Sequence, residues 1–245
     1  MVPLNDGEFV MSRDFLSDPR PHDELVDDAG TVHLPIGCFL LPGEPTILVD
    51  VGFGPRESAP LRGGLLLEEL AAVGVRPPDV DLIVISHLHR DHRGWLATPD
   101  ALPTFPNAEV MVGRGDWSFF VEQEARPLEE IERAVLGALY ESGRLSLIDR
   151  EQEIASGLVA LPAPGHTPGH TVYAVVDGDE RALLLGDSMY CPQQLSELDW
   201  GALVDTDPAL ARRTREVLYR DLERHGSVAV GCHFPGLRAA RLLGR

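Results

Sequence analysis

Residues 86–95 read Ser-His-Leu-His-Arg-Asp-His-Arg-Gly-Trp, and this stretch constrains the fold more than any other. The apolar residues before it, 82–85, predict a short buried strand. The stretch then lies on the loop at the carboxyl end of that strand, where open α/β sheets place their ligand sites. Such a density of metal-binding side chains predicts a metal site rather than a solvated loop. These side chains are His87, His89, Asp91 and His92.

Three more metal-binding side chains occur later, each after a predicted strand. His166 lies in the loop Pro-Gly-His-Thr-Pro-Gly-His at 164–170, whose prolines and glycines favour a tight turn. Asp187 follows the apolar run 183–185, and His233 follows the predicted strand 228–230. Each position alone is weak evidence, but together they predict one shared metal centre.

The seven side chains divide into two sets that share one carboxylate. The first set has three histidines and an open fourth position, as catalytic zinc sites do; it consists of His87, His89 and His166. The second set consists of Asp91, His92 and His233, and Asp187 is available to both. Imidazole and carboxylate ligands favour zinc, with manganese, iron or cobalt as alternatives. We therefore expect two zinc ions per chain.

The motif His87-x-His89-x-Asp91-His92, followed by the three later side chains, resembles the metallo-β-lactamase-fold hydrolases in residue type, order and spacing. The resemblance spans most of the chain, from residues 5–7 to residues 233–235. It is specific for the fold and for a dinuclear site, and much less so for the substrate. It implies an α/β protein, an αβ/βα four-layer sandwich of two mixed β-sheets with helices on the outer faces and the site at one edge.

Within this family the chain is most similar to the dizinc lactonases and to the methyl-parathion-hydrolase-like group. Residues 187–190, Asp-Ser-Met-Tyr, resemble the acyl-homoserine lactonases, in which a tyrosine three residues after the bridging aspartate lies over the metals. Residues 93–95, 106–109, 187–193 and 233–236 are closer to the methyl-parathion-hydrolase-like group. Cys232 replaces no ligand and is interpreted as a packed thiol, unlike the cysteine ligand of authentic β-lactamases.

The resemblance implies a dinuclear metal-dependent hydrolase that cleaves a lactone or ester bond of a small molecule with a hydroxide bridging the metals. Asp91 would then move a proton as well as bind metal, and Tyr190 would hydrogen-bond the substrate carbonyl or leaving group. The alternative for Tyr190 is an aromatic residue at the rim of the site. Organophosphate or phosphodiester hydrolysis is the alternative function. Glyoxalase II-like thioesterase, β-lactamase and diiron flavoprotein-like redox activities are less favoured.

Composition excludes several classes of partner. The chain has 39 acidic and 21 basic residues, a formal net charge of -18, which argues against nucleic acid because phosphates require clustered lysine and arginine. No apolar run approaches the length of a membrane span. Three cysteines without a paired pattern, and an N-terminus without signal-peptide features, predict a cytoplasmic protein.

The 245 residues are interpreted as one domain, 1–245, with residues 1–31 as an irregular N-terminal arm that is either a loose extension or a lid. Strands are expected at 33–41, 46–51, 82–85, 109–112, 145–148, 158–161, 172–176, 182–185 and 228–230, and helices at 65–73, 116–123, 128–142 and 208–224. An exposed aromatic helix near Trp117 is a candidate surface for a homodimer.

Overall fold

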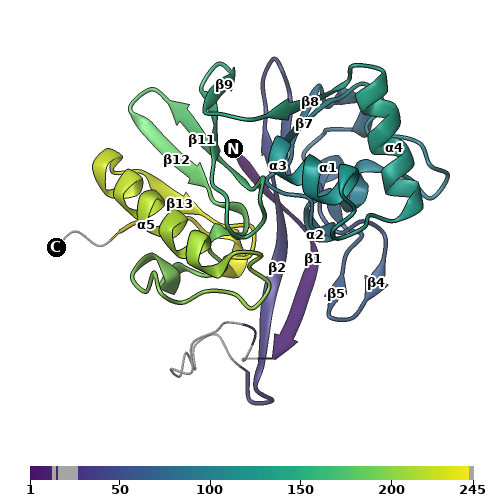
Figure 1. Ribbon diagram of the computed structural model, residues 1–245. Coiled ribbons are helices and arrows are strands. Elements are labelled where there is room, and N and C mark those ends of the chain that lie inside the picture. The colour runs from purple at the N-terminus through teal and green to yellow at the C-terminus, as the bar shows by residue number, and fades with distance from the viewer. Residues whose placement is uncertain (13–14, 16–26, 243–245) are drawn as a thin grey trace.

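The computed structural model describes residues 1–12, 15 and 27–242. Its core consists of two β-sheets packed face to face, and helices cover the outer face of each sheet (Figure 1). This arrangement confirms the predicted four-layer α/β sandwich. Within the described residues, no helix is long and apolar enough to cross a membrane.

The first sheet has eight strands. They are β1 (Val2–Ser12), β2 (Thr31–Leu41), β3 (Ile47–Val49), β4 (Glu57–Ser58), β5 (Leu61–Arg62), β6 (Leu82–Val84), β7 (Glu109–Gly113) and β8 (Leu145–Ile148). The spatial order is β4-β5-β1-β2-β3-β6-β7-β8, in which β3, β6, β7 and β8 run parallel. Helices α1 (Leu66–Ala72) and α4 (Glu130–Glu141) cover its outer face.

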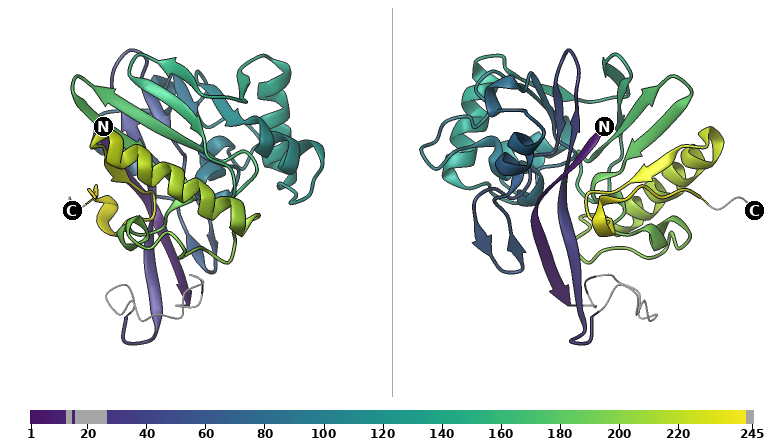
Figure 2. Two further views of the ribbon diagram at one scale, coloured as in Figure 1. Left: turned by 60° about the vertical axis from the view of Figure 1, so that its left-hand side comes forward. Right: turned by 180° about the vertical axis from the view of Figure 1, so that it is seen from behind.

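The second sheet has five strands. They are β9 (Gln152–Ala155), β10 (Leu158–Pro162), β11 (Thr171–Asp177), β12 (Glu180–Leu184) and β13 (Val228–Val230). The spatial order is β13-β12-β11-β10-β9; β12 and β13 are parallel and the other pairs are antiparallel. Helix α5 (Pro208–His225) lies along its outer face (Figure 2). Asp207 caps the start of α5, and Gly226 ends it in the left-handed conformation.

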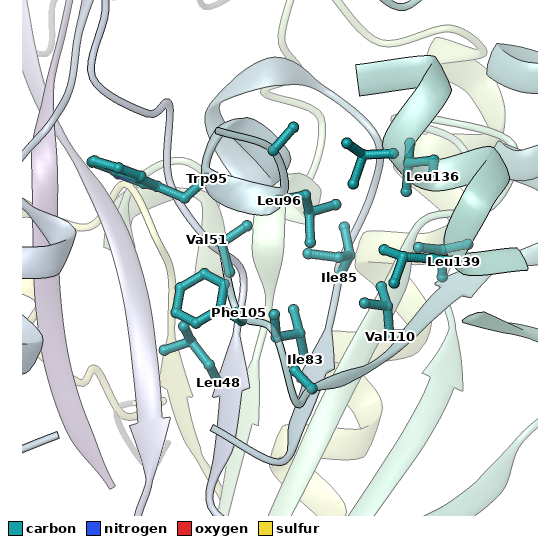
Figure 3. Packing of buried hydrophobic residues seen from close by; sticks show 14 of the residues in the cluster. Leu48, Val51, Ile83, Ile85, Trp95, Leu96, Phe105, Val110, Leu136 and Leu139 are labelled. Atoms are coloured by element: carbon teal, nitrogen blue, oxygen red, sulfur yellow. The ribbon is translucent and has the colours of Figure 1, made fainter. Parts of the chain in front are cut away.

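Central strands are apolar at every position because both of their faces are buried. In β3, Val49 packs between the two sheets, whereas Leu48 packs beneath the outer helices. In β6, Val84 likewise packs between the two sheets, and Ile83 packs beneath the outer helices. Figure 3 shows the outer cluster, in which Leu48 and Ile83 lie in the same packed layer as side chains of α4. The continuous apolar runs that predicted buried strands therefore fill two separate cores.

The interpretation of residues 1–31 as an irregular arm is wrong over its first part. Residues 2–12 form β1, which pairs antiparallel with β2, and the two strands extend beyond the other strands of the sheet (Figures 1 and 2). The sequence of β1 is polar because most of its residues are only partly buried, and within β1 only Leu4, Asp6 and Met11 are buried. The Asp6 carboxylate accepts hydrogen bonds from the backbone of Phe53 and Leu66, which ties β1 to the loop after β3 and to α1. Residues 13–14 and 16–26 of the predicted arm lie outside the described residues.

The helix predicted at 116–123 is a short helical turn, α3 (Arg114–Asp116), followed by a π-helical segment, η5 (Trp117–Glu122). The expectation that its aromatic residues are exposed is wrong. Trp117 and Phe120 are buried, and Trp117 stacks on Tyr140 of α4 with a centroid separation of 4.6 Å. These aromatic side chains fasten the segment to the core and do not form a free dimer surface.

The remaining short helical elements lie in the loops around the strand ends. They are η3 (Pro77–Asp79), α2 (Arg90–Arg93), η4 (Gly94–Leu96), η6 (Gly186–Ser188), η7 (Pro192–Leu195) and η8 (Pro235–Leu237). Strands β6, β10, β12 and β13 all end at the same edge of the sandwich, since their pairings give them a common direction within each sheet. Side chains that follow these strands therefore meet between the two sheets.

Candidate metal centre

The first three-histidine set predicted from the sequence meets around one point. The Nδ1 atom of His89 lies 3.0 Å from Nε2 of His87 and 2.9 Å from Nε2 of His166. The Asp187 Oδ2 atom lies 3.6 Å from His87 Nε2 and 3.4 Å from His166 Nε2. Four donor atoms from three separate loops therefore face one another.

The second set meets beside the first, around the other oxygen of the same carboxylate. Asp187 Oδ1 lies 3.1 Å from His92 Nε2 and 3.2 Å from His233 Nε2. Asp91 Oδ2 lies 3.7 Å and 3.5 Å from the same two nitrogens. The structure thus brings all seven predicted side chains together, and Asp187 contributes one oxygen to each set.

Both sets fit a divalent metal ion. With zinc–nitrogen bonds of 2.0–2.1 Å in a tetrahedron, neighbouring ligand atoms lie about 3.3 Å apart, and the separations in both sets bracket that value. His92 Nε2 and His233 Nε2 are also buried, and although carboxylate oxygens lie 3.1–3.7 Å away, neither nitrogen makes a hydrogen bond of acceptable geometry. A buried polar atom without a partner costs free energy, and a metal ion between these two nitrogens would satisfy both.

The ring nitrogens that face away from the centre are held by the surrounding protein. His92 Nδ1 lies 2.8 Å from Asp50 Oδ2, and His166 Nδ1 lies 2.9 Å from Asp205 Oδ1. His233 Nδ1 donates to the Pro35 carbonyl oxygen at 2.7 Å. Such contacts fix the orientation of a ligating imidazole and the nitrogen that carries its hydrogen.

Asp187 is held by three neighbours. Its backbone N–H donates to His170 Nε2 at 3.1 Å, as expected for a supporting rather than ligating histidine. The Tyr190 hydroxyl donates to Oδ2 at 2.7 Å. The Cys232 thiol donates to Oδ1 at 3.2 Å, so this cysteine lies against the second donor set and is more than a packed thiol.

Comparison with known proteins agrees with this geometry. Residues 34–233 match the model of the metallo-beta-lactamase superfamily. The chain belongs to this superfamily. It is a hydrolase of the metallo-beta-lactamase fold.

Its relatives include several lactonases. An N-acyl homoserine lactonase of Bacillus thuringiensis is 28% identical over 213 residues, which cover 78% of this chain and 79% of the relative. Metallo-beta-lactamase domain-containing protein 1 of mouse is 34% identical over 173 residues, covering 69% of this chain and 54% of the relative. Among solved structures, the hydrolase AbOPH superposes with a TM-score of 0.85 at 25% identity, covering 99% of this chain and 89% of the other. The dizinc quorum-quenching lactonase AidC superposes with a TM-score of 0.81 at 25% identity, covering 99% and 90%.

The electrostatics of the candidate metal centre differ between the two donor sets. Burial lowers the pKa of His87 and of His89 well below the usual range, so both imidazoles are neutral near pH 7. Burial also opposes charge on His92 and His233. Asp187 and Asp91 outweigh it at His92, and Cys232 and Asp187 outweigh it at His233, so that both pKa values are raised well above the usual range. The metal-free protein therefore holds protons where the second set would hold a cation.

A pocket of about 280 Å³ opens onto both donor sets. Asp91, Asp187 and Tyr190 lie in its wall, so the donors are accessible to a small molecule. Most of the remaining wall is apolar or cationic and is made by Phe9, Phe15, Leu61, Leu88, Phe120, Val204, Arg90, Arg93 and Arg126. A larger cavity of about 570 Å³ lies against η7 and α5, and its wall contains no metal-binding side chain.

Tyr190 is not a rim residue, because only 2% of its surface is exposed. Its ring stacks on His233 with a centroid separation of 5.2 Å and an interplanar angle of 3°. Burial and the neighbouring Asp187 raise the pKa of Tyr190 well above its usual range, so its hydroxyl stays protonated. The residue is consequently a hydrogen-bond donor at the wall of the pocket.

Sequence reasoning missed several residues around the centre. Asp116 is buried and accepts hydrogen bonds from Leu88 N at 2.7 Å and Gly169 N at 2.6 Å, which joins the loop of the first motif to the loop of His166. The sequence around Asp205 does not indicate a role at the site, since this residue lies in a polar stretch without a motif. The position of Asp50 is a weak indication of such a role, because Asp50 follows an apolar strand as His87 does.

Proposed function

We propose that this hydrolase uses two divalent metal ions, in the first place zinc, to cleave a lactone or ester bond of a small molecule. The observation that carries the proposal is the pair of donor sets that share Asp187 and open onto one pocket. His87, His89 and His166 would hold one ion. Asp91, His92 and His233 would hold the other, and Asp187 would bind both.

Two such ions, held by these residues, would supply a water of lowered pKa and would polarise the carbonyl of the substrate. Asp50, Asp205 and the Pro35 carbonyl oxygen orient three of these histidines through contacts with the ring nitrogens that face away from the centre. Asp91, ionised because the adjacent histidines lower its pKa to about 2 against the effect of burial, accepts the proton released on attack. The Tyr190 hydroxyl turns from Asp187 to donate to the substrate oxygen or to the departing alkoxide.

Apolar pocket walls support a lactone or ester with a hydrocarbon portion. Phe9, Phe15 and Phe120 line the pocket and exclude water from the space that the substrate would fill. The similarity to N-acyl homoserine lactonases supports the same class of bond. Phe9 of β1 and Phe15 therefore bring the N-terminal part of the described chain to the pocket wall.

The decisive experiment combines metal analysis with a substrate panel. We expect purified protein to bind about two zinc ions per chain and to hydrolyse acyl-homoserine lactones or aryl esters faster than phosphotriesters. Asp187→Ala should lose both zinc and activity, because each ion loses an oxygen ligand. Faster turnover of phosphotriesters would replace the proposal with organophosphate hydrolysis, and full turnover by metal-free Asp187→Ala would refute metal-dependent catalysis.

The role of Tyr190 is tested separately by Tyr190→Phe, which removes only the hydroxyl. We expect zinc content to be unchanged and kcat to fall by roughly 10–100-fold, since one hydrogen bond to developing charge is lost. Steady-state kinetics on the preferred substrate measure this. Unchanged kcat would assign Tyr190 to holding Asp187 alone.

A further inference from the structure

Arg126 contacts His89 at the ring nitrogen that faces away from the donor set. An NH1 atom of Arg126 lies 2.6 Å from His89 Nε2, on the side of the ring that faces away from the donor set. His89 presents Nδ1 to the other donors, at 3.0 Å from His87 Nε2 and 2.9 Å from His166 Nε2. The guanidinium therefore donates to the nitrogen that does not point at the metal position.

This contact is incompatible with metal binding at Nδ1. A neutral imidazole carries one hydrogen, and a ring that binds metal through one nitrogen carries that hydrogen on the other. With metal on Nδ1 of His89, Nε2 becomes a donor and faces the donors of Arg126. Two donors cannot share a hydrogen bond, so the Arg126 guanidinium has to take another partner when the centre is loaded.

The surroundings of Arg126 contain no ready replacement. Three arginines line the pocket; Arg90 pairs with Glu129 at 2.6 Å, and Arg93 pairs with the buried Glu132. Within the described part of the chain, no carboxylate lies within ion-pair distance of Arg126. Its side chain is exposed at the pocket wall and faces the space that a substrate would occupy.

We propose that Arg126 is a specificity-determining residue that binds a carboxylate on the substrate, so that this hydrolase prefers esters or lactones carrying a carboxylate beyond the bond it cleaves. The inference rests on the proposed function. A carboxylate matches the planar donor fork of arginine, whereas one guanidinium alone is a sparse site for a phosphate. The net charge of -18 gives no general attraction for anions, so the preference depends on this local cation.

The test compares two esters of equal chain length, 4-nitrophenyl hydrogen adipate and 4-nitrophenyl hexanoate, on zinc-loaded protein. We expect Arg126→Gln to lower kcat/KM for the adipate ester roughly 10–100-fold, mainly through KM, and to leave the hexanoate ester nearly unchanged. Arg126→Lys keeps the charge and should recover part of the loss. Arg220→Gln changes the net charge equally at an exposed position on α5 and should behave as the wild type.

Calorimetric titration of the same zinc-loaded proteins with adipate provides a readout that does not depend on turnover. Tighter binding of adipate by the wild type than by Arg126→Gln supports the carboxylate site at Arg126. This holds even if the protein hydrolyses neither ester. Absence of hydrolysis would contradict the proposed ester cleavage and would leave the carboxylate site supported. Equal adipate affinity in the two proteins, or equal losses on both esters, would show that Arg126 merely supports His89 and would overturn the proposal. Tighter binding of inorganic phosphate than of adipate would overturn the choice of a carboxylate.

Discussion

At the scale of single residues, the centre depends on carboxylates that never touch the metal positions. Asp50 is the clearest case. One of its oxygens accepts from Ser86 N at 2.7 Å, and the other accepts from the Ser86 hydroxyl and from His92 Nδ1. Its backbone is in the left-handed region, with φ of 57°, which aspartate and asparagine tolerate better than most residues. This one residue therefore sets both the strand-end turn and the orientation of a metal-binding ring.

We predict that Asp50→Asn weakens zinc binding by roughly 10–100-fold, because an amide NH₂ then faces His92 Nδ1–H or the ring turns over. Asparagine tolerates the left-handed backbone, so the fold itself should survive. Competition with a chromophoric chelator measures the affinity. Asp177→Asn, at an exposed position at the end of β11, is the control. Equal affinities in the two variants would contradict the assigned role of Asp50.

At the scale of elements, close packing of backbone against backbone holds the two ligand loops together. Strand β7 and helix α3 touch the loop that carries His166, since a Cβ at Gly113 would lie 1.8 Å from the Gly169 carbonyl oxygen. A Cβ at Gly169 would lie 2.1 Å from the backbone nitrogen of Asp116. Neither contact leaves room for a side chain, so these glycines are required by space.

We predict that Gly169→Ala lowers the free energy of unfolding by about 1–3 kcal/mol and weakens zinc binding, because the loop must move away from α3. Gly137→Ala is the matched control: it lies in α4 with nothing within 4 Å of the added Cβ. That control should stabilise the protein by roughly 0.5–1 kcal/mol through helix propensity. Denaturant unfolding compares them, and a Gly169→Ala protein as stable as the control would refute the argument.

At the scale of the whole molecule, the sandwich concentrates negative charge and histidines at one edge between the two sheets. The chain carries a formal charge of -18, and Asp91 and Asp187 are both buried there beside four of the histidines. Nearby histidines lower the pKa of Asp187 well below its usual range although burial opposes this. Burial of such charge is tolerable only with cations, either protons on the histidines or bound metal.

We predict that the two metal ions of the proposed centre respond differently to pH. The raised pKa values of His92 and His233 mean that these rings carry protons near neutral pH in the metal-free protein, and ligation must displace them. Affinity at the second set should therefore rise as pH increases from 6 to 8. Affinity at the first set should change less, because the pKa of His87 and of His89 is already lowered.

Calorimetric titration of metal-free protein with zinc, in buffers of different ionisation enthalpy, measures the protons released with each ion. The second ion should release more protons than the first at pH 7. Binding of both ions with no proton release, at an affinity independent of pH, would contradict the assigned protonation states.

The side chains that can form the centre are recognisable from the amino-acid sequence alone. Apolar runs mark the strands, and the metal-binding residues directly follow them, so His87, His166, Asp187 and His233 were recognisable as a set. The family resemblance carried by these residues also predicted the two sheets with helices on their outer faces. Strand β1 was missed because its partly buried, polar pattern gains stability from pairing with β2 and not from local hydrophobicity.

The surroundings of those side chains depend on tertiary packing. Asp50 meets His92 across 42 residues of chain, Asp205 meets His166 across 39, and Arg126 meets His89 across 37. No periodicity or local motif encodes such a pairing, because it depends on how loops that follow different strands pack against one another at a shared edge. Local sequence specifies the donors at the end of each strand, whereas long-range packing specifies their orientation and the chemistry of the pocket that they face.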